Sequence, residues 1–236
     1  MNNEKIILDL CGGTGAWSVF YKRAGSRVIV ITLPDFDIMD IVCRGENIEI
    51  KQRNRSPFPD MWEIIPIRKI YGILFAPPCT YFSFARTNAK KMRDLEGAMR
   101  IVKKGLEIIW FAQHKPVSNT AKYTTLKFWA LENPYYGLLK NFIGKPCYVF
   151  NPYDFGDGYQ KKTALWGNFN EPKKCPVELT PQMKKLAKTN SYLHKKKFDY
   201  LLNDEIHPEK LDVLDRQARR AITPAGFAKA FYEANK

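Results

Sequence analysis

The sequence predicts an α/β fold built on one mostly parallel sheet, and two features of its pattern lead to this expectation. Residues 5–32 read as an apolar strand, a glycine-rich turn, a short amphipathic helix and a β-branched strand, which together form the unit of a parallel sheet. Further on, an apolar strand at 70–76 precedes a strong helical repeat at 94–113 and another apolar strand at 128–133. The chain has 236 residues, 45% of them hydrophobic, so one main domain can bury such a sheet.

The individual elements follow from local patterns along the chain. We expect a strand at 5–9, a helix at about 16–24, a strand at 26–32, strands within 146–156 and 162–169 that could pair in antiparallel fashion, and a final helix from about Pro224. Residues 43–69 contain charge runs and three prolines, so we expect a long loop there with at most one helical turn.

Composition excludes several classes of protein. No run of about eighteen apolar residues predicts a membrane span, and the N-terminus lacks the pattern of a signal peptide, so we expect a soluble, intracellular protein. The five cysteines are scattered, with no CxxC pair and no nearby histidines, which predicts reduced thiols and neither a disulfide framework nor a metal site.

Charge points to a polyanionic partner. The formal net charge is +14 and the pI is about 9.5. Ten lysines and only three acidic residues fall within residues 160–200, interleaved with aromatic and amide side chains, a mixture suited to phosphate contact with some base stacking. A solvated, lysine-rich face is the alternative interpretation.

Three chemically unusual loops follow predicted strands, at the edge of a parallel sheet where ligands gather. The loop "DLCGGTG" opens a helix and lets backbone N–H groups approach a dinucleotide or an adenosyl compound, although Gly12, Gly13 and Gly15 do not fit GxGxxG. The other two loops are "APPCTYFS", residues 76–83, and "ENP", residues 132–134.

The second and third loops carry candidate catalytic groups. A lone cysteine after a strand is usually a small buried hydrophobe, but two prolines ahead of Cys79 stiffen the backbone and aim the thiol, as covalent catalysis requires. Glu132 ends a hydrophobic strand, so partial desolvation could keep it protonated near neutral pH. The alternative for Glu132 is a structural carboxylate bonded to nearby backbone.

Together these motifs resemble the DNA cytosine-5 methyltransferases, most closely the short, phage-type members. "LDLCGGTGAWS" is similar to the cofactor loop of that family, "PPCTYFS" to its nucleophile loop, "ENP" to its Glu-Asn motif and "YQKKTALWG" to its Gln-x-Arg-x-Arg motif. The resemblance covers roughly residues 5–170, with a weaker similarity in "RRAITPAGFAKAF". It implies a Rossmann-like fold that uses S-adenosylmethionine.

The resemblance also implies roles for individual residues. The thiolate of Cys79 would add to C6 of a cytosine flipped out of double-stranded DNA, Glu132 would protonate or hydrogen-bond N3, and Asn133 would fix that geometry. The implied cofactor-binding residues are Asp9, Leu10, Cys11, Gly12, Gly13, Thr14, Gly15, Trp17, Thr32, Leu33, Asp37 and Pro77. The implied DNA-binding residues are Pro78, Ser83, Arg86, Gln160, Lys161 and Lys162.

The chain departs from the family pattern in three ways. Thr32 replaces the acid expected to hold the cofactor ribose, so Asp35 or Asp37 would serve instead. Lys162 and Ala164 replace the motif arginines, which keeps one charge but loses the bidentate fork. The region available for target recognition is small, so we expect a short or degenerate target, on the order of two to four base pairs.

The expected organisation is a catalytic core at 1–169, a basic target-recognition segment at 170–217 and a C-terminal helix at 218–236 that returns to the core. We expect a monomer in the cytoplasm of a bacterial or phage-infected cell. The alternatives are a methyltransferase acting on cytosine in RNA, single strands or free nucleotides, and a catalytically silent nucleic-acid-binding protein of the same fold.

Overall fold

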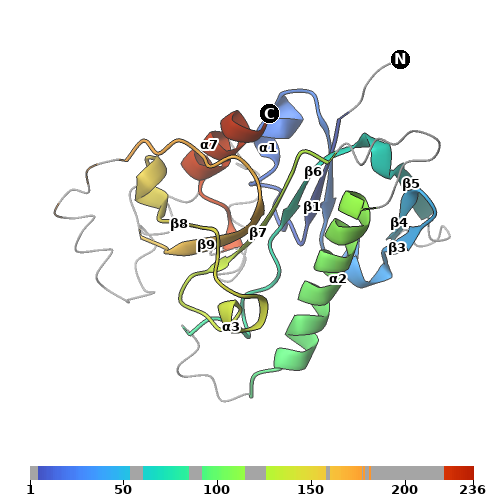
Figure 1. The fold of residues 1–236 in the computed structure, drawn as a ribbon, viewed down its shortest axis with the longest axis horizontal. Helices are drawn as coiled ribbons and strands as arrows, with labels where there is room; N and C mark the ends of the chain where they lie inside the picture. The colour runs from blue at the N-terminus through green and yellow to red at the C-terminus, as the bar shows by residue number, and fades with distance from the viewer. Residues whose placement is uncertain are drawn as a thin grey trace.

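The protein is a mixed α/β structure with a mostly parallel central sheet. The computed structural model describes residues 5–53, 61–84, 92–114, 126–157, 160–176, 178, 181 and 221–236. Figure 1 shows the six-stranded sheet, which has the order β2-β1-β6-β7-β9-β8. Its strands are β1 (Ile6–Leu10), β2 (Arg27–Ile31), β6 (Ile70–Phe75), β7 (Phe128–Pro134), β8 (Tyr148–Phe150) and β9 (Thr163–Asn168).

Strands β2, β1, β6 and β7 are parallel, whereas β9 runs antiparallel to both β7 and β8. The predicted strands and the predicted antiparallel pair are therefore confirmed.

The helices are α1 (Val19–Arg23), α2 (Leu95–His114), α3 (Lys140–Ile143) and α7 (Ala225–Asn235), with short 3₁₀ turns η1 (Ile38–Asp40), η2 (Ile67–Lys69) and η3 (Pro152–Phe155). The helices expected at 94–113 and from Pro224 are confirmed. Helix α1 is shorter than expected because the residues before it stay in turns, with Gly15 at φ +74° and the Ser18 side chain hydrogen-bonded back into the loop.

Alternation along β1 assigns each strand face to one hydrophobic core. Ile6, Leu8 and Leu10 join a core that includes Val102 and Ile109 of α2, whereas Ile7 joins a second core that includes residues of α1 and α7. In Figure 1, α2 accordingly lies on one side of the sheet and α1 and α7 lie on the other. The sheet is buried on both faces, as parallel sheets require.

Helix α7 is bound to the core by ring contacts and hydrogen bonds. Phe227 stacks on Phe150 with ring centroids 3.9 Å apart, and Asp157 accepts a hydrogen bond from Gly226 N at 2.9 Å. At the other end, the buried Asn235 side chain exchanges two hydrogen bonds with the backbone of Asn170, at 2.8 and 3.0 Å. These contacts connect the C-terminal helix to the residues after β9.

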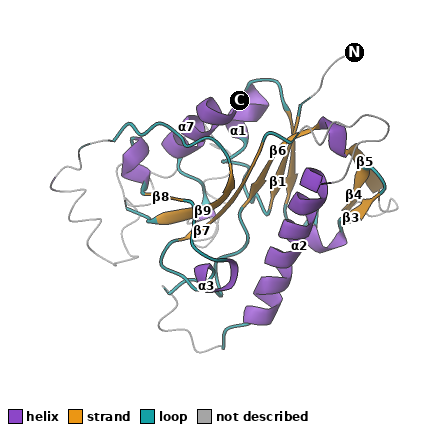
Figure 2. Ribbon diagram, in the orientation of Figure 1, coloured by secondary structure: helices purple, strands orange, loops and turns teal. Residues whose placement is uncertain are grey.

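The expectation of irregular structure at 43–69 is wrong. An antiparallel three-stranded sheet forms there from β3 (Val42–Arg44), β4 (Asn47–Gln52) and β5 (Met61–Pro66), visible beside α2 in Figure 2. In β4 the buried Ile48 and Ile50 alternate with partly exposed polar residues, and Gly45 turns the chain between β3 and β4 with φ +57°. The side chains of Ile48 and Ile50 extend the core on the α2 side.

No helix within the described ranges is both long and apolar enough to span a membrane. Of the ten lysines between 160 and 200, those at 184, 185, 188, 195, 196 and 197 lie outside the described residues. The same holds for most of the expected target-recognition segment.

Candidate functional site

The three loops singled out from the sequence begin side by side at one edge of the sheet. Leu10 of β1 pairs in register with Phe75 of β6, and Phe75 pairs with Leu131 of β7. Strands β1 and β6 end at this level, whereas β7 continues to Pro134, so residues 132–134 lie in the strand and do not form a loop after it. The backbone N–H of Ala76 then donates to the carbonyl of Leu10 at 2.9 Å, which continues the pairing into the loops. The expected convergence of the glycine loop, the Cys79 loop and the Glu132-Asn133 pair is confirmed.

The glycine loop folds tightly over the carboxyl group of Asp9. Gly12 N donates to Asp9 O at 3.3 Å and Gly15 N donates to Gly12 O at 2.9 Å. A Cβ at position 12 would overlap the Asp9 carboxyl group, so only glycine fits there without a shift. Gly13 has φ +56° and is exposed, with open space where its Cβ would stand, so the outer side of the loop is accessible.

Asp9 is buried within this loop, and its carboxyl group holds a proton to higher pH than an exposed aspartate does. Burial raises the pKa of Asp9 to about 7, with the hydrogen bond from Ser18 opposing the rise. Ser18 Oγ lies 2.6 Å from Asp9 Oδ2 and 3.2 Å from Gly15 O, but its hydroxyl has one hydrogen to donate. A proton on Asp9 lets the carboxyl donate to Ser18 and frees the hydroxyl to donate to Gly15, which satisfies both contacts.

The Cys79 loop is a tight turn fastened at several points. The backbone N–H groups of Phe82 and Ser83 donate to the carbonyl of Cys79 at 3.0 and 2.8 Å. Arg93 donates to the carbonyls of Tyr81 and Ser83 at 2.6 and 3.0 Å. The half-buried thiol of Cys79 therefore stands on a fixed backbone. Sequence patterns gave no sign of the role of Arg93, because its partners are backbone groups.

Asn133 joins the end of β7 to the Cys79 loop. Its side chain is buried, and Nδ2 donates to the carbonyl of Pro77 at 3.0 Å, across 56 positions of sequence. Pro77 is itself buried, whereas Pro78 is exposed. Asn133 is thus a positioning residue for the loop that carries Cys79.

Glu132 is partly desolvated, as expected from its position at a strand end. Its side chain is 18% exposed, and Lys161 Nζ lies 3.9 Å from Oε1. Burial raises the pKa of Glu132 and the nearby Lys161 ammonium opposes that rise. A carboxyl group in this state can hold a proton closer to neutral pH than an exposed glutamate.

Burial keeps two other cysteines, Cys11 and Cys43, as neutral thiols. Burial, together with the carboxylates of Asp9 and Asp37, raises the pKa of Cys11 to about 12, and burial raises that of Cys43 to about 11. A thiol becomes a strong nucleophile only when deprotonated. Cys11, the other cysteine in the loops at this edge, is therefore a poor competitor to Cys79.

The remaining cofactor candidates lie in different surroundings. Thr32 and the exposed Leu33 follow β2, and Asp37 accepts from Met39 N at 2.9 Å and pairs with Arg53 at 3.2 Å. Leu10 ends β1 and Thr14 is half-buried in the glycine loop. Trp17 lies in the core rather than on the loop surface, packed edge-to-face on Phe231.

The expected DNA-binding residues are only partly described. Ser83 lies in the Cys79 turn, and Gln160, Lys161 and Lys162 lead into β9, with Gln160 exposed. Arg86 lies outside the described residues. Lys162 O accepts from Tyr135 N at 3.0 Å, which connects this segment to the residues after Glu132-Asn133.

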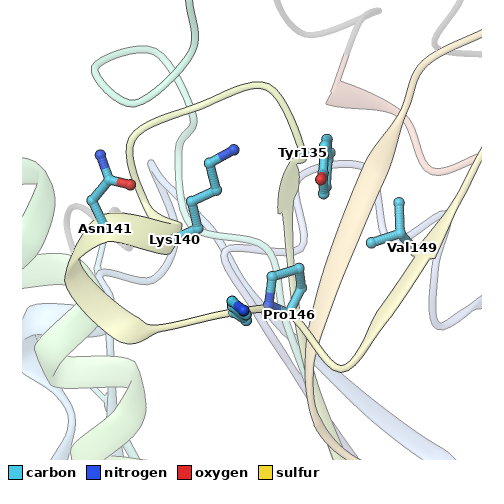
Figure 3. Close-up of a pocket in the computed structure, with 6 residues that line it drawn as sticks. Tyr135, Lys140, Asn141, Pro146 and Val149 are labelled. Carbon is cyan, nitrogen blue, oxygen red and sulfur yellow. The ribbon is translucent and has the colours of Figure 1, made fainter.

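Sequence reasoning missed a basic hollow beside this connection. The residues that line it are Tyr135, Lys140, Asn141, Lys145, Pro146 and Val149, drawn in Figure 3. They come from the turn after β7, from α3 and from the approach to β8. The sequence "PYYGLLKNFIGKP" does contain two lysines and two tyrosines, but their convergence depends on the turn at Gly144.

No protein-family model matches the chain, and a search of curated proteins gives no match.

Proposed function

We propose that the protein is a DNA cytosine-5 methyltransferase that uses S-adenosylmethionine. The observation that carries the proposal is the meeting of the Cys79 loop and the Glu132-Asn133 strand end at neighbouring parallel strands, tied by the Asn133–Pro77 hydrogen bond. A covalent catalyst needs both groups at one reacting base, and this edge of the sheet brings them from positions far apart in sequence.

The residues at the glycine loop fit an adenosyl cofactor. Gly12 allows the close loop over Asp9, and the exposed Gly13 leaves open space on the outer side of the loop. The backbone of Cys11 to Gly15 would hold the amino-acid end of the cofactor, and Thr32, Leu33 or Asp37 the ribose. Asp37 already pairs with Arg53, which leaves Asp35, exposed after β2, as the competing candidate for the ribose. When bound, S-adenosylmethionine supplies an electrophilic methyl group.

In this proposal, Cys79 and Glu132 work from two sides of the cytosine ring. The Cys79 thiolate adds to C6, and the electron pair of the C5–C6 double bond moves to C5, which takes up the methyl group. Glu132 donates a proton or a hydrogen bond to N3 and offsets the negative charge that builds in the ring. Loss of the C5 proton to solvent then expels the thiolate from C6 and restores the C5–C6 double bond, and N3 returns its proton to Glu132.

Duplex DNA must present such a cytosine outside the stack, because neither group reaches a paired base. Lys161 lies beside Glu132, and Lys162 lies beside Tyr135; both would contact the strand near the flipped base. The lysine-rich segment at 170–217 would grip phosphates, and the helix at 218–236 would complete the core. With few arginines to read base edges, the target would be short.

The test is transfer of tritiated methyl groups from S-adenosylmethionine to duplex DNA, RNA and dCMP in parallel. The proposal predicts label in duplex DNA, at C5 of cytosine after digestion to nucleosides. Label confined to RNA or to dCMP would favour a methyltransferase that acts on RNA or on free nucleotides, respectively. Absence of label from all three, with DNA binding retained, would favour a binding protein without catalysis.

A further inference from the structure

Two lysines lie over one aromatic ring beside the candidate site, and a third lines the hollow next to it. Lys162 Nζ lies 4.3 Å from the centroid of the Tyr135 ring and Lys140 Nζ lies 4.8 Å from it. Figure 3 shows the Lys140 side chain extending toward one side of the Tyr135 ring, with Val149 on the other side and Pro146 below. Lys145 lines the same hollow and is exposed.

These lysines carry unbalanced positive charge. Within the described part of the chain, no carboxylate forms an ion pair with Lys140, Lys145 or Lys162, whereas the adjacent Lys161 pairs with Glu132. The ammonium groups of Lys140 and Lys162 lie 4.8 and 4.3 Å from one ring centroid, so they are at most about 9 Å apart and physiological salt screens their repulsion only in part. An anion in the hollow would offset that repulsion.

The Tyr135 ring positions the ammonium groups of Lys140 and Lys162 before any anion binds. A cation over an aromatic face is attracted by the ring quadrupole, so the ring holds Lys140 and Lys162 without neutralising them. The backbone of Tyr135 is fixed by its hydrogen bond to Lys162 O. The ring is therefore a positioning element for the two charges.

The hollow adjoins the loop that carries Cys79. Leu138 N donates to Phe82 O at 2.9 Å, Phe84 N donates to Tyr136 O at 3.4 Å, and Ser83 forms a β-bridge with Gly137. The turn after Tyr135 and the turn after Cys79 are thus joined by backbone contacts. A strand whose base reached Cys79 would pass within reach of these lysines.

We propose that the hollow lined by Tyr135, Lys140 and Lys145, together with Lys162 on the same tyrosine ring, binds a backbone phosphate of the DNA substrate. This inference rests on the proposed function, and it adds Tyr135, Lys140 and Lys145, which lie outside the motifs of the family resemblance, to Lys162, which lies within one. The phosphate oxygens take the charge of the three ammonium groups, while Pro146 and Val149 give the hollow an apolar floor. Such a contact holds the strand in place and reads no sequence.

The test measures DNA binding directly, so it does not depend on methyl transfer. Fluorescence anisotropy of a labelled duplex would be followed against salt for the wild type and for Lys140→Gln/Lys145→Gln. Neutralising one phosphate contact should lower the slope of log K against log salt by about 0.9 and weaken binding on the order of tenfold at 0.1 M salt. The matched control is Lys22→Gln/Lys229→Gln, which removes two exposed lysines from α1 and α7 on one face of the sheet.

A second pair of variants tests the role of the ring. Tyr135→Phe keeps the aromatic face and should bind DNA as the wild type does, whereas Tyr135→Leu should lower both affinity and salt slope. If Tyr135 had only a structural role, Tyr135→Leu would lose thermal stability but keep the wild-type slope of log K against log salt.

The outcomes separate this inference from the proposed function. If the lysine variants bind DNA with the affinity and slope of the wild type, or lose affinity only for RNA, the inference is overturned even where the protein methylates DNA. If they lose DNA affinity as stated while the wild type transfers no methyl group, the inference stands and the proposed function fails.

Discussion

Replacing Asn133 with alanine removes the side-chain hydrogen bond that ties the end of β7 to the Cys79 loop. The bond from Asn133 Nδ2 to Pro77 O is 3.0 Å long and buried, so its loss leaves the Pro77 carbonyl without that donor. An unsatisfied buried carbonyl costs roughly 1–3 kcal/mol. The unpartnered Oδ1 of Asn133 disappears with the substitution, which moves the expected cost toward the lower half of that range.

The stability loss should be modest and the loss of activity large. For a chain of this size, each kcal/mol lowers Tm by about 2–4 °C, so the expected drop is about 2–8 °C. Cys79 lies two residues beyond Pro77, and a shift of about 1 Å in a catalytic group can cost on the order of 100-fold in rate. We therefore expect kcat for methyl transfer to fall about 100-fold, measured at a temperature where the variant is fully folded.

Asn235→Ala is the matched control. Asn235 is also buried, and it hydrogen-bonds Asn170 and Phe231 on the α7 side of the sheet, away from the Cys79 loop. It should lose at least as much stability, followed by denaturant unfolding, and keep its kcat. Wild-type stability and kcat in Asn133→Ala, or an equal fall of kcat in both variants, would refute the reasoning.

Three further predictions concern the carboxyl groups and the glycine loop. Glu132→Gln should lower kcat by roughly 10²- to 10⁴-fold and remove the alkaline decline of the pH–rate profile, because the amide has no proton to lose in this range. Lys161→Gln should instead move that decline to higher pH, because the lysine opposes the rise in the pKa of Glu132. An unchanged profile in both variants would remove Glu132 from the mechanism. Gly12→Ala should weaken S-adenosylmethionine binding at least tenfold, measured by calorimetry, because the new Cβ would overlap the Asp9 carboxyl group. Gly13 has φ +56° and open space around it, so Gly13→Ala should cost only about 1–2 kcal/mol of backbone strain. Equal cofactor affinity in the two variants would contradict this prediction. Asp9 binds its proton more tightly in the folded state, with a pKa of about 7 against an ordinary 3.8, so its contribution to stability is complete below about pH 4 and is lost as pH rises toward 7, by up to about 1.4 kcal/mol per pH unit. Asp9→Asn should therefore flatten unfolding free energy between pH 4 and 7 relative to the wild type, and an identical slope in the two proteins would refute the assignment.

The sequence predicted the central sheet because its strands are apolar and β-branched and its loops carry glycine and proline. The same rules failed at 43–69. Charge runs and prolines predict a loop there, yet Ile48 and Ile50 alternate with polar residues and form strand β4. Helix α1 was expected to begin earlier, and it does not because Ser18 bonds to Asp9 and Gly15 instead of continuing the helix.

The candidate site could be predicted in outline but not in its connections. Strand ends indicated that the segments carrying Cys79 and Glu132 lie at one edge of the sheet, and the register of β6 and β7 places these two strands side by side there. Three connections could not be predicted from residue patterns, because they depend on backbone atoms or on turn geometry. They are the Asn133–Pro77 hydrogen bond, the contacts of Arg93 with the Cys79 turn, and the hollow beside Tyr135. Trp17 was expected at the cofactor because of its position after the loop, yet its indole packs in the core against α7.

The central claim is that Cys79 attacks C6 of a cytosine in DNA. Duplex DNA that carries 5-fluorocytosine tests it most directly, because fluorine cannot leave from C5 as a proton does and the covalent adduct is trapped. With S-adenosylmethionine present, wild-type protein should give a denaturant-stable protein–DNA species, and peptide mass spectrometry should place the link on Cys79. Cys79→Ser should bind the same DNA and form no adduct, since a serine hydroxyl is far less ionised than a thiol. An adduct linked to another residue, or no adduct from wild-type protein that binds both DNA and cofactor, would contradict the account.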